Sequence, residues 1–212
     1  MKIQEIEPTP NPNAMKFVVD QRITTGFVTH SFEDAEAAQQ VPLARKIFEI
    51  DHVISVYFAD RWITVTQDGQ ADWAELLREI AEPIREATPE DINAEVGAKG
   101  DSASGALRGE DEEIPGLDDP RMERIEAIIE SEILPFLQGD GGGLKIEGLV
   151  DDELMIRYEG ACGTCPASMT GTLMAIENLL QVEVDEHLTV TSIEGGVGGG
   201  MGGGLGGIPP IF

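Results

Sequence analysis

Two cysteines, Cys162 and Cys165, are the only ones in a chain of 212 residues, and they lie in the stretch ACGTCPAS. This Cys-x-x-Cys spacing brings two sulfurs within reach of one metal ion or of each other. Gly163 lets the backbone between them bend tightly, and Pro166 suits the first position of a helix. Cys165 is therefore predicted to lie at a helix N-terminus, where the helix dipole favours a thiolate. Such a loop suits iron–sulfur or zinc ligation and redox exchange alike.

Two alternatives treat the pair as complete, or nearly complete, within one chain. A dithiol–disulfide oxidoreductase of thioredoxin type needs no further ligands. Its cysteine pair follows a strand of a parallel sheet, however, and the sequence shows no βαβ pattern that would place the pair there. A structural zinc site needs four nitrogen or sulfur ligands. The three histidines, His30, His52 and His187, form no spaced ligand pair, and only His187 is expected in the same domain as the cysteines.

Ligand counting favours an iron–sulfur cluster shared between two chains. Clusters typically take four thiolates, and two copies of the pair Cys162 and Cys165 supply that number. We expect a homodimer with one bridging cluster on its two-fold axis, and a monomer without the cluster. A cluster held at a subunit boundary by two short loops is exposed and easily given up, which suits a carrier. A zinc ion shared by a dimer in the same way is a third alternative.

The composition excludes several other classes of function. Asp and Glu number 40 against 14 Lys and Arg, a net charge of -26. Binding to nucleic acid or to anionic lipid needs clustered cations, so neither is expected. The sequence contains no run of 18 apolar residues, so no transmembrane helix is predicted. The start, MKIQEIEPTPNPN, has neither a secretion signal nor a transit peptide, so we expect a cytoplasmic protein with reduced thiols.

An acidic segment divides the chain into two predicted domains. Residues 88–119 carry ten acidic residues against Lys99 and Arg108, with five glycines, which predicts a flexible, self-repelling linker. It separates a first domain, residues 1–87, from a second domain, residues 120–194. Residues 195–212 form a glycine-rich tail, which is predicted to be disordered or a loose coil.

The first domain is predicted to alternate strands and helices. Strands are expected in KIQEIE and AMKFVVD, helical pieces over 31–50 interrupted by Pro42, a hairpin in VISVYFA and WITVTQ, and a final helix in ADWAELLREIAEPIREA. The second domain reads as a long amphipathic helix over 120–138 with Pro120 in its first turn, two strands in GDGGGLKIEGLV and DDELMIRYEG, a helix from Pro166 to about Leu180, and a strand in HLTVTSI. Both domains are thus predicted to be small two-layer α+β units.

Two stretches carry a resemblance to a known family. ILPFLQGDGGG and GACGTCPASMTGTLMAIENLL resemble the NifU-like C-terminal domain of the Nfu iron–sulfur carrier and scaffold proteins, over about residues 120–194. EPTPNPNAMKF, near the start, resembles the Nfu N-terminal domain. The two matches follow the order that the family has.

The resemblance implies a non-catalytic protein that accepts, holds and passes on a cluster, usually [4Fe-4S]. It implies a cluster donor and apo iron–sulfur client proteins as partners, with Cys162 and Cys165 as the cofactor-binding and metal-binding residues of a bridging site. It also implies that the first domain assists partner recognition. Gly143 departs from the family, which often has an acidic or polar residue after DGG, and a looser turn is expected there. The glycine-rich tail is a second departure.

Other residues near these motifs are given structural roles. Asp140, Gly141 and Gly142 are expected to form a turn. Thr164 is a candidate hydrogen-bond donor to a cysteine sulfur. Asn11, in the first domain, is expected to stabilise an Asn-Pro turn.

Overall fold

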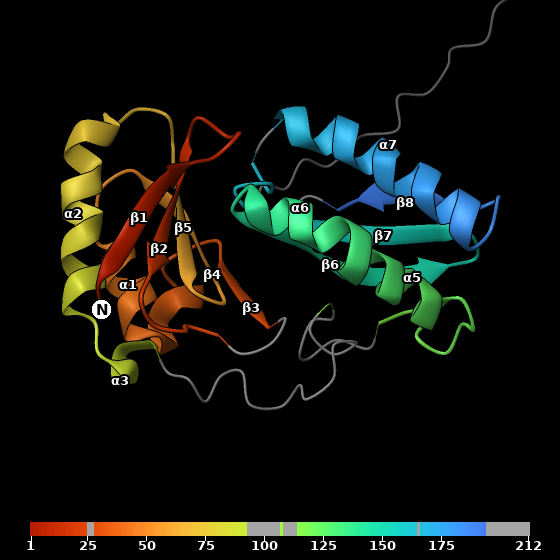
Figure 1. The fold of residues 1–212 in the computed structure, drawn as a ribbon, viewed down its shortest axis with the longest axis horizontal. Coiled ribbons are helices and arrows are strands. Elements are labelled where there is room, and N and C mark those ends of the chain that lie inside the picture. The colour runs from red at the N-terminus through yellow and green to blue at the C-terminus, as the bar shows by residue number, and fades with distance from the viewer. Residues whose placement is uncertain (25–27, 93–106, 108–113, 165, 194–212) are drawn as a thin grey trace, which may run out of the picture.

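The structure is a computed structural model that describes residues 1–24, 28–92, 107, 114–164 and 166–193, without the side chains of 166–170. These residues form two α+β domains, each with its own hydrophobic core, and Figure 1 shows them side by side. The predicted fold class is confirmed. No helix among the described residues is both long and apolar enough to cross a membrane.

The first domain is built on a five-stranded antiparallel sheet in the order β1-β2-β5-β4-β3. Its strands are β1 (Ile3–Pro8), β2 (Ala14–Val19), β3 (Thr29–Phe32), β4 (Val53–Ala59) and β5 (Trp62–Gln67). The predicted hairpin is confirmed as β4 and β5, which are joined by the two residues 60–61. The edge strand β3 corrects the sequence analysis in part, because residues 31–32 were expected to be helical and instead pair with β4.

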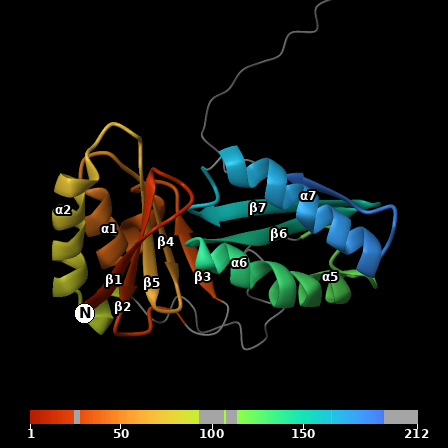
Figure 2. The same cartoon turned by 45° about the horizontal axis from the view of Figure 1, so that its top comes forward.

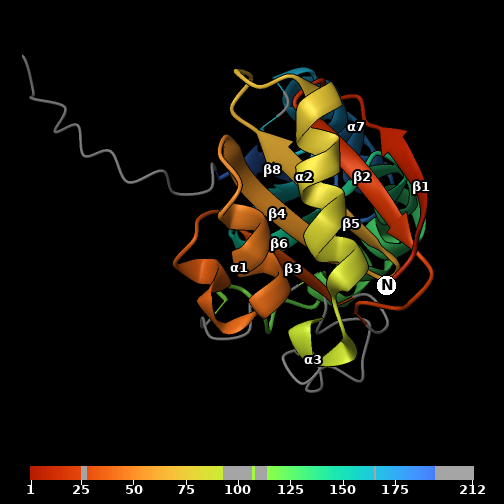
Figure 3. The same cartoon turned by 90° about the vertical axis from the view of Figure 1, so that its left-hand side faces the viewer.

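Helices cover one face of this sheet, as Figure 3 shows most directly. They are a 3-10 helix (Ala37–Gln40), α1 (Pro42–Phe48), α2 (Trp73–Glu86) and α3 (Pro89–Ile92). Pro42 begins α1, where its missing N–H leaves no hydrogen bond unmade. Asp72 caps α2 by accepting a hydrogen bond of 2.8 Å from the backbone N–H of Ala74. The predicted final helix of the domain is therefore confirmed.

Alternation along the strands sorts apolar residues to the helix side of the sheet. In β5, Ile63 and Val65 belong to the first core, whereas Thr64 and Thr66 point to the opposite face. That opposite face is polar but buried. Figures 1 and 2 show why, since the second domain lies on the side of the sheet away from α1 and α2.

The second domain has a three-stranded sheet in the order β6-β7-β8. Its strands are β6 (Gly142–Val150), β7 (Glu153–Gly160) and β8 (Thr189–Ser192). β6 and β7 form the predicted hairpin, while β8 runs parallel to β7. The chain returns between these two strands through α7 (Pro166–Glu183), so β7, α7 and β8 form a βαβ unit. The sequence analysis was wrong to find no such pattern, because a pairing between distant strands leaves no local signature.

The helix predicted over 120–138 forms with a local irregularity. It consists of α5 (Met122–Ile128), a π-helical turn (Ile129–Ile133) and α6 (Leu134–Gly139). Pro120 precedes the helix rather than lying in its first turn. The α5–α6 helix and α7 pack side by side as one layer on one face of the sheet (Figure 2). Their apolar side chains join those of the strands in one core.

The predicted linker, residues 88–119, is described only in part, and the described residues are attached to the domains. Ile92 at the end of α3 is buried in the first core, and Leu107 is buried in the second. The backbone N–H of Ile146 donates to the Leu107 carbonyl at 2.8 Å, and that of Leu149 donates to Pro115 at 2.8 Å. The expectation of a flexible linker therefore does not hold for these residues, because their apolar side chains find a core. The predicted tail, 195–212, lies outside the described residues.

Candidate functional site

The loop that carries the cysteines connects the end of β7 to the start of α7. Cys162 follows the strand by two residues and is only 2% exposed, with its side chain in the second core. The backbone N–H of Gly163 donates to the Gly160 carbonyl at 3.1 Å and closes a tight turn around Cys162. Cys165, the other predicted ligand, lies outside the described residues. The structure therefore places one of the two predicted sulfurs, in the loop before α7, and the predicted position of Cys165 at the helix N-terminus stays a prediction.

The glycines before β6 serve the geometry of this loop. Gly141 has a φ of +80°, so the predicted turn is confirmed. At Gly142 a Cβ would lie 2.6 Å from the Cys162 Sγ and 2.6 Å from the carbonyl oxygen of Glu159. Only a residue without a side chain allows the start of β6 to pass this close to the cysteine. Gly142 is thus a positioning element of the site that was predicted only as part of a turn.

A buried carboxylate lies in the same strand end. Glu159 is 3% exposed, forms an ion pair of 3.1 Å with Lys145, and accepts a hydrogen bond of 2.8 Å from the Thr29 hydroxyl. Burial of an ionised carboxylate is unfavourable unless charge and hydrogen bonds compensate it, and both are present here. Thr29 belongs to β3 of the first domain, so this compensation comes partly from outside the second domain.

The first domain also contacts the cysteine loop directly. The Asn11 side-chain amide donates to the Ala161 carbonyl at 3.0 Å and to the Thr164 hydroxyl at 2.8 Å. Its carbonyl oxygen accepts from the backbone N–H of Asn13 at 3.0 Å, which is the predicted turn. Asn11 therefore stabilises its own turn and also binds the cysteine loop, whereas the sequence analysis predicted only the turn. Thr164 accepts this hydrogen bond through its hydroxyl oxygen, and its candidate role as a donor to sulfur stays a prediction.

Tyr57 of β4 packs against the glycines of the second domain. A Cβ at Gly143 would lie 2.5 Å from the Tyr57 hydroxyl oxygen, and a Cβ at Gly160 would lie 2.9 Å from the Tyr57 ring. Gly143 therefore does not make a looser turn, as was expected, because it lies within β6 opposite Glu159 and its side-chain space is taken by Tyr57. Burial, with a further effect of the Glu159 carboxylate, raises the pKa of the Tyr57 phenol well above its ordinary value, so the phenol is neutral.

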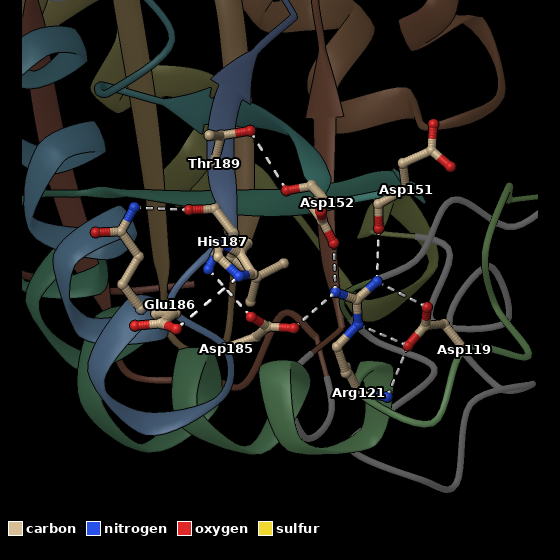
Figure 4. A network of polar contacts seen from close by, with 10 residues as sticks. Asp119, Arg121, Asp151, Asp152, Asp185, Glu186, His187 and Thr189 are labelled. Atoms are coloured by element: carbon tan, nitrogen blue, oxygen red, sulfur yellow. Dashed lines mark hydrogen bonds and ion pairs between the residues drawn. The ribbon is translucent and has the colours of Figure 1, made fainter.

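An ion-pair network holds the opposite end of the second domain, as Figure 4 shows. The Arg121 guanidinium donates to the carboxylates of Asp119 at 3.0 Å, Asp152 at 2.8 Å and Asp185 at 3.2 Å. These contacts tie the start of α5 to the β6–β7 turn and to the loop before β8. The network raises the pKa of Arg121, first through its hydrogen bond with Asp119. It is a structural clamp, since β7 separates it from the cysteine loop.

Metal-ligating side chains do not gather elsewhere in the described part of the chain. No group of three or more His, Cys, Asp or Glu residues that could hold a metal ion occurs among the described residues. The side chain of His187 is 73% exposed and lies 3.9 Å from Glu186. It is therefore a surface residue in the same domain as Cys162, and nothing in the described part of the chain makes it a third ligand for that cysteine.

Comparison with known proteins agrees with these two domains. A family model described as "Scaffold protein Nfu/NifU N terminal" matches residues 3–91, and one described as "NifU-like domain" matches residues 125–191. The chain is 30% identical over 191 residues to the Homo sapiens protein named NFU1 iron-sulfur cluster scaffold homolog, mitochondrial, covering 86% of this chain and 68% of that protein. It is 26% identical over 190 residues to the protein of the same name from Drosophila willistoni, covering 90% of this chain and 62% of that protein.

Among solved structures, a solution structure of a NifU-like protein from Saccharomyces cerevisiae is 25% identical, with a TM-score of 0.36, and the match covers 39% of this chain and 75% of that one. The two domain matches, in the order and at the boundaries that the structure has, and the human relative establish the identification. The chain belongs to the Nfu family.

Proposed function

We propose that this chain is a non-catalytic iron–sulfur cluster scaffold and carrier. Two copies bind one cluster, of the [4Fe-4S] type, between them through Cys162 and Cys165, and pass it to apo-proteins. Membership of the Nfu family supports the scaffold role, because the human and Drosophila relatives are named iron-sulfur cluster scaffold homologs. The chain is proposed to work in the cytoplasm, with a cluster donor and apo iron–sulfur proteins as partners.

Ligand number is the observation that carries this function. The chain has two cysteines, and the described residues bring no further group of metal ligands together. Four thiolates complete a typical cluster site, so a second copy supplies the missing half. The cluster is the cargo, and a site divided between two chains releases it when the chains part.

The position of the loop supports this chemistry. Cys162 lies in the loop between the end of β7 and the start of α7, and Cys165, which directly precedes Pro166 in the sequence, is proposed to be the thiolate that the helix N-terminus favours. The turn from Gly160 to Gly163 holds the sulfur at one end of the domain, away from the Arg121 clamp. The end of the domain is where a second copy can meet it on a two-fold axis.

The test is anaerobic reconstitution with iron and sulfide, followed by iron analysis and mass measurement in solution. A brown dimer with about four irons per two chains is expected. Cys162→Ala and Cys165→Ala should each abolish both the colour and the dimer, while the control His187→Ala should keep both. A cluster retained by the double cysteine variant, or held by a monomer, would refute the assignment.

A dithiol–disulfide oxidoreductase is the alternative, because the β7–α7–β8 unit removes the topological objection to it. It requires reduction of a model disulfide by the metal-free protein under anaerobic conditions. Such turnover, lost in Cys162→Ala, would replace the proposed function. Elemental analysis of the purified protein separates iron from the third alternative, a shared zinc ion.

A further inference from the structure

The polar face of the first sheet is a docking surface for the cysteine end of the second domain. β4 and β5 lie against β7, as Figures 1 and 2 show in two orientations. Hydrogen bonds between described residues cross from one domain to the other: Asn11 to Ala161, Asn11 to Thr164, Thr29 to Glu159, and Lys16 to the carbonyl of Gly139 at 3.4 Å. These contacts are polar, and domains joined by a polar rather than a large hydrophobic interface ordinarily move relative to one another.

The contacts concentrate on the segment that carries the proposed ligands. Ala161 directly precedes Cys162, and Thr164 directly precedes Cys165. The amide of Asn11 therefore joins the loop on both sides of Cys162. Asn11 is itself 3% exposed, so its amide is committed to the loop rather than to water.

The shapes of the two surfaces are matched by glycines of the second domain. Besides Gly143 and Gly160, which accommodate Tyr57, a Cβ at Gly141 would lie 3.1 Å from the Thr64 hydroxyl oxygen. Tyr57 and Thr64 are both fully buried. Bare backbone on one side and fitted side chains on the other indicate a specific contact rather than a chance approach.

This arrangement conflicts with the binding of a shared cluster. A thiolate that ligates a cluster together with a second chain must reach the molecular surface, yet Cys162 is buried at the edge of the second core, Tyr57 of the first domain packs on Gly143 and Gly160 beside it, and Asn11 holds its loop. We propose that the first domain is a removable cap on the cysteine loop, and that the two domains must part before a second copy can bind. The inference rests on the proposed function for its purpose, but the closed contact can be tested without iron.

Gly143 offers a substitution that acts on the contact alone. Within the second domain the nearest atom to a Cβ at this position is the Glu159 Oε2, at 4.0 Å, so alanine fits there. Across the contact the same Cβ collides with the Tyr57 hydroxyl, which cannot swing away because Tyr57 is fully buried. Gly143→Ala is therefore expected to separate the domains and leave each one folded.

The measurement is the rate at which a maleimide alkylates Cys162 in the full chain carrying Cys165→Ser. Gly143→Ala should raise this rate about tenfold, the factor expected when a few weak contacts that hold a closed state are lost. Adding Tyr57→Phe removes the colliding oxygen and should restore the slow rate, whereas Tyr57→Phe alone should change little. The hydroxyl makes no hydrogen bond to any residue that the structure describes, so its removal is mild.

A second pair of variants tests the hydrogen bonds. Asn11→Ala should also accelerate alkylation, and Asn13→Ala, whose side chain lies near Gly69 of the first domain, should not. Equal rates in the parent, Gly143→Ala and Asn11→Ala would overturn the cap, as would a Gly143→Ala effect that Tyr57→Phe does not reverse. The alkylation assay contains no iron, so it tests the cap independently of cluster binding. Failure of the reconstitution experiment would refute the proposed function and leave the result of the alkylation assay unchanged.

Discussion

Replacing Gly142 with alanine is expected to destabilise the second domain and to displace Cys162. The new Cβ would lie 2.6 Å from the Cys162 sulfur and 2.6 Å from the backbone oxygen of Glu159, whereas unstrained contacts begin near about 3.5 Å. One of the two atoms belongs to the β7 backbone and moves only with the strand. Overpacking of this kind typically lowers the free energy of unfolding by about 1–3 kcal/mol, and we expect about 2 kcal/mol here.

Unfolding measured by far-UV circular dichroism tests this expectation. For a domain of this size the loss corresponds to a fall of roughly 8–16 °C in the midpoint of the second domain. Both tryptophans, Trp62 and Trp73, lie in the first domain, so their fluorescence reports that domain and should keep its transition. Gly139→Ala is the matched control, since a Cβ there meets nothing within 4 Å. A Gly142→Ala protein as stable as the control would show that β6 moves aside freely and that the close approach is not required.

Three further outcomes concern stability. Arg121→Ala should lower the free energy of unfolding by about 1–2 kcal/mol in a urea titration. Arg124→Ala removes an exposed ion pair with Glu183, which solvent screens, and should lower the same free energy by less than about 0.5 kcal/mol. Equal losses in the two variants would contradict the clamp. Gly171→Ala, inside α7 with nothing near its Cβ, should raise the thermal midpoint by the equivalent of about 0.5–1 kcal/mol, and a fall would contradict the open space. Arg121 lowers the pKa of Asp119, so the stability from this carboxylate is full above its ordinary pKa of about 4 and lost as the pH falls further. Acid unfolding curves of the parent and Arg121→Ala should therefore converge at low pH, and a constant gap would refute the linkage.

Local patterns in the sequence were sufficient for most of the secondary structure. The hairpin of β4 and β5 follows from two β-branched runs, and α2 from apolar residues at helical spacing. The edge strand β3 escaped because it has four residues and little apolar content, so it carries no clear period. The parallel pairing of β8 with β7 escaped because the two strands are separated by a helix, and pairing across that distance has no local pattern.

The candidate site was likewise only half accessible from the sequence. The number and spacing of Cys162 and Cys165 are covalent facts, and ligand counting needs nothing more. The alternation of Thr64 and Thr66 with apolar neighbours also determined which residues share a face of the first sheet. Alternation says nothing of what covers a polar face, however, and such a face would ordinarily be in water.

The amino-acid sequence alone determined two α+β domains, the cysteine pair and the family's two motifs. Tertiary structure decided that Cys162 is buried, that Asn11 binds the loop around it, and that Gly143 faces Tyr57. The physical reason is distance along the chain. Asn11 and Ala161 are 150 residues apart, and whether an amide meets a carbonyl across such a separation depends on how two folded surfaces fit, which no local pattern encodes.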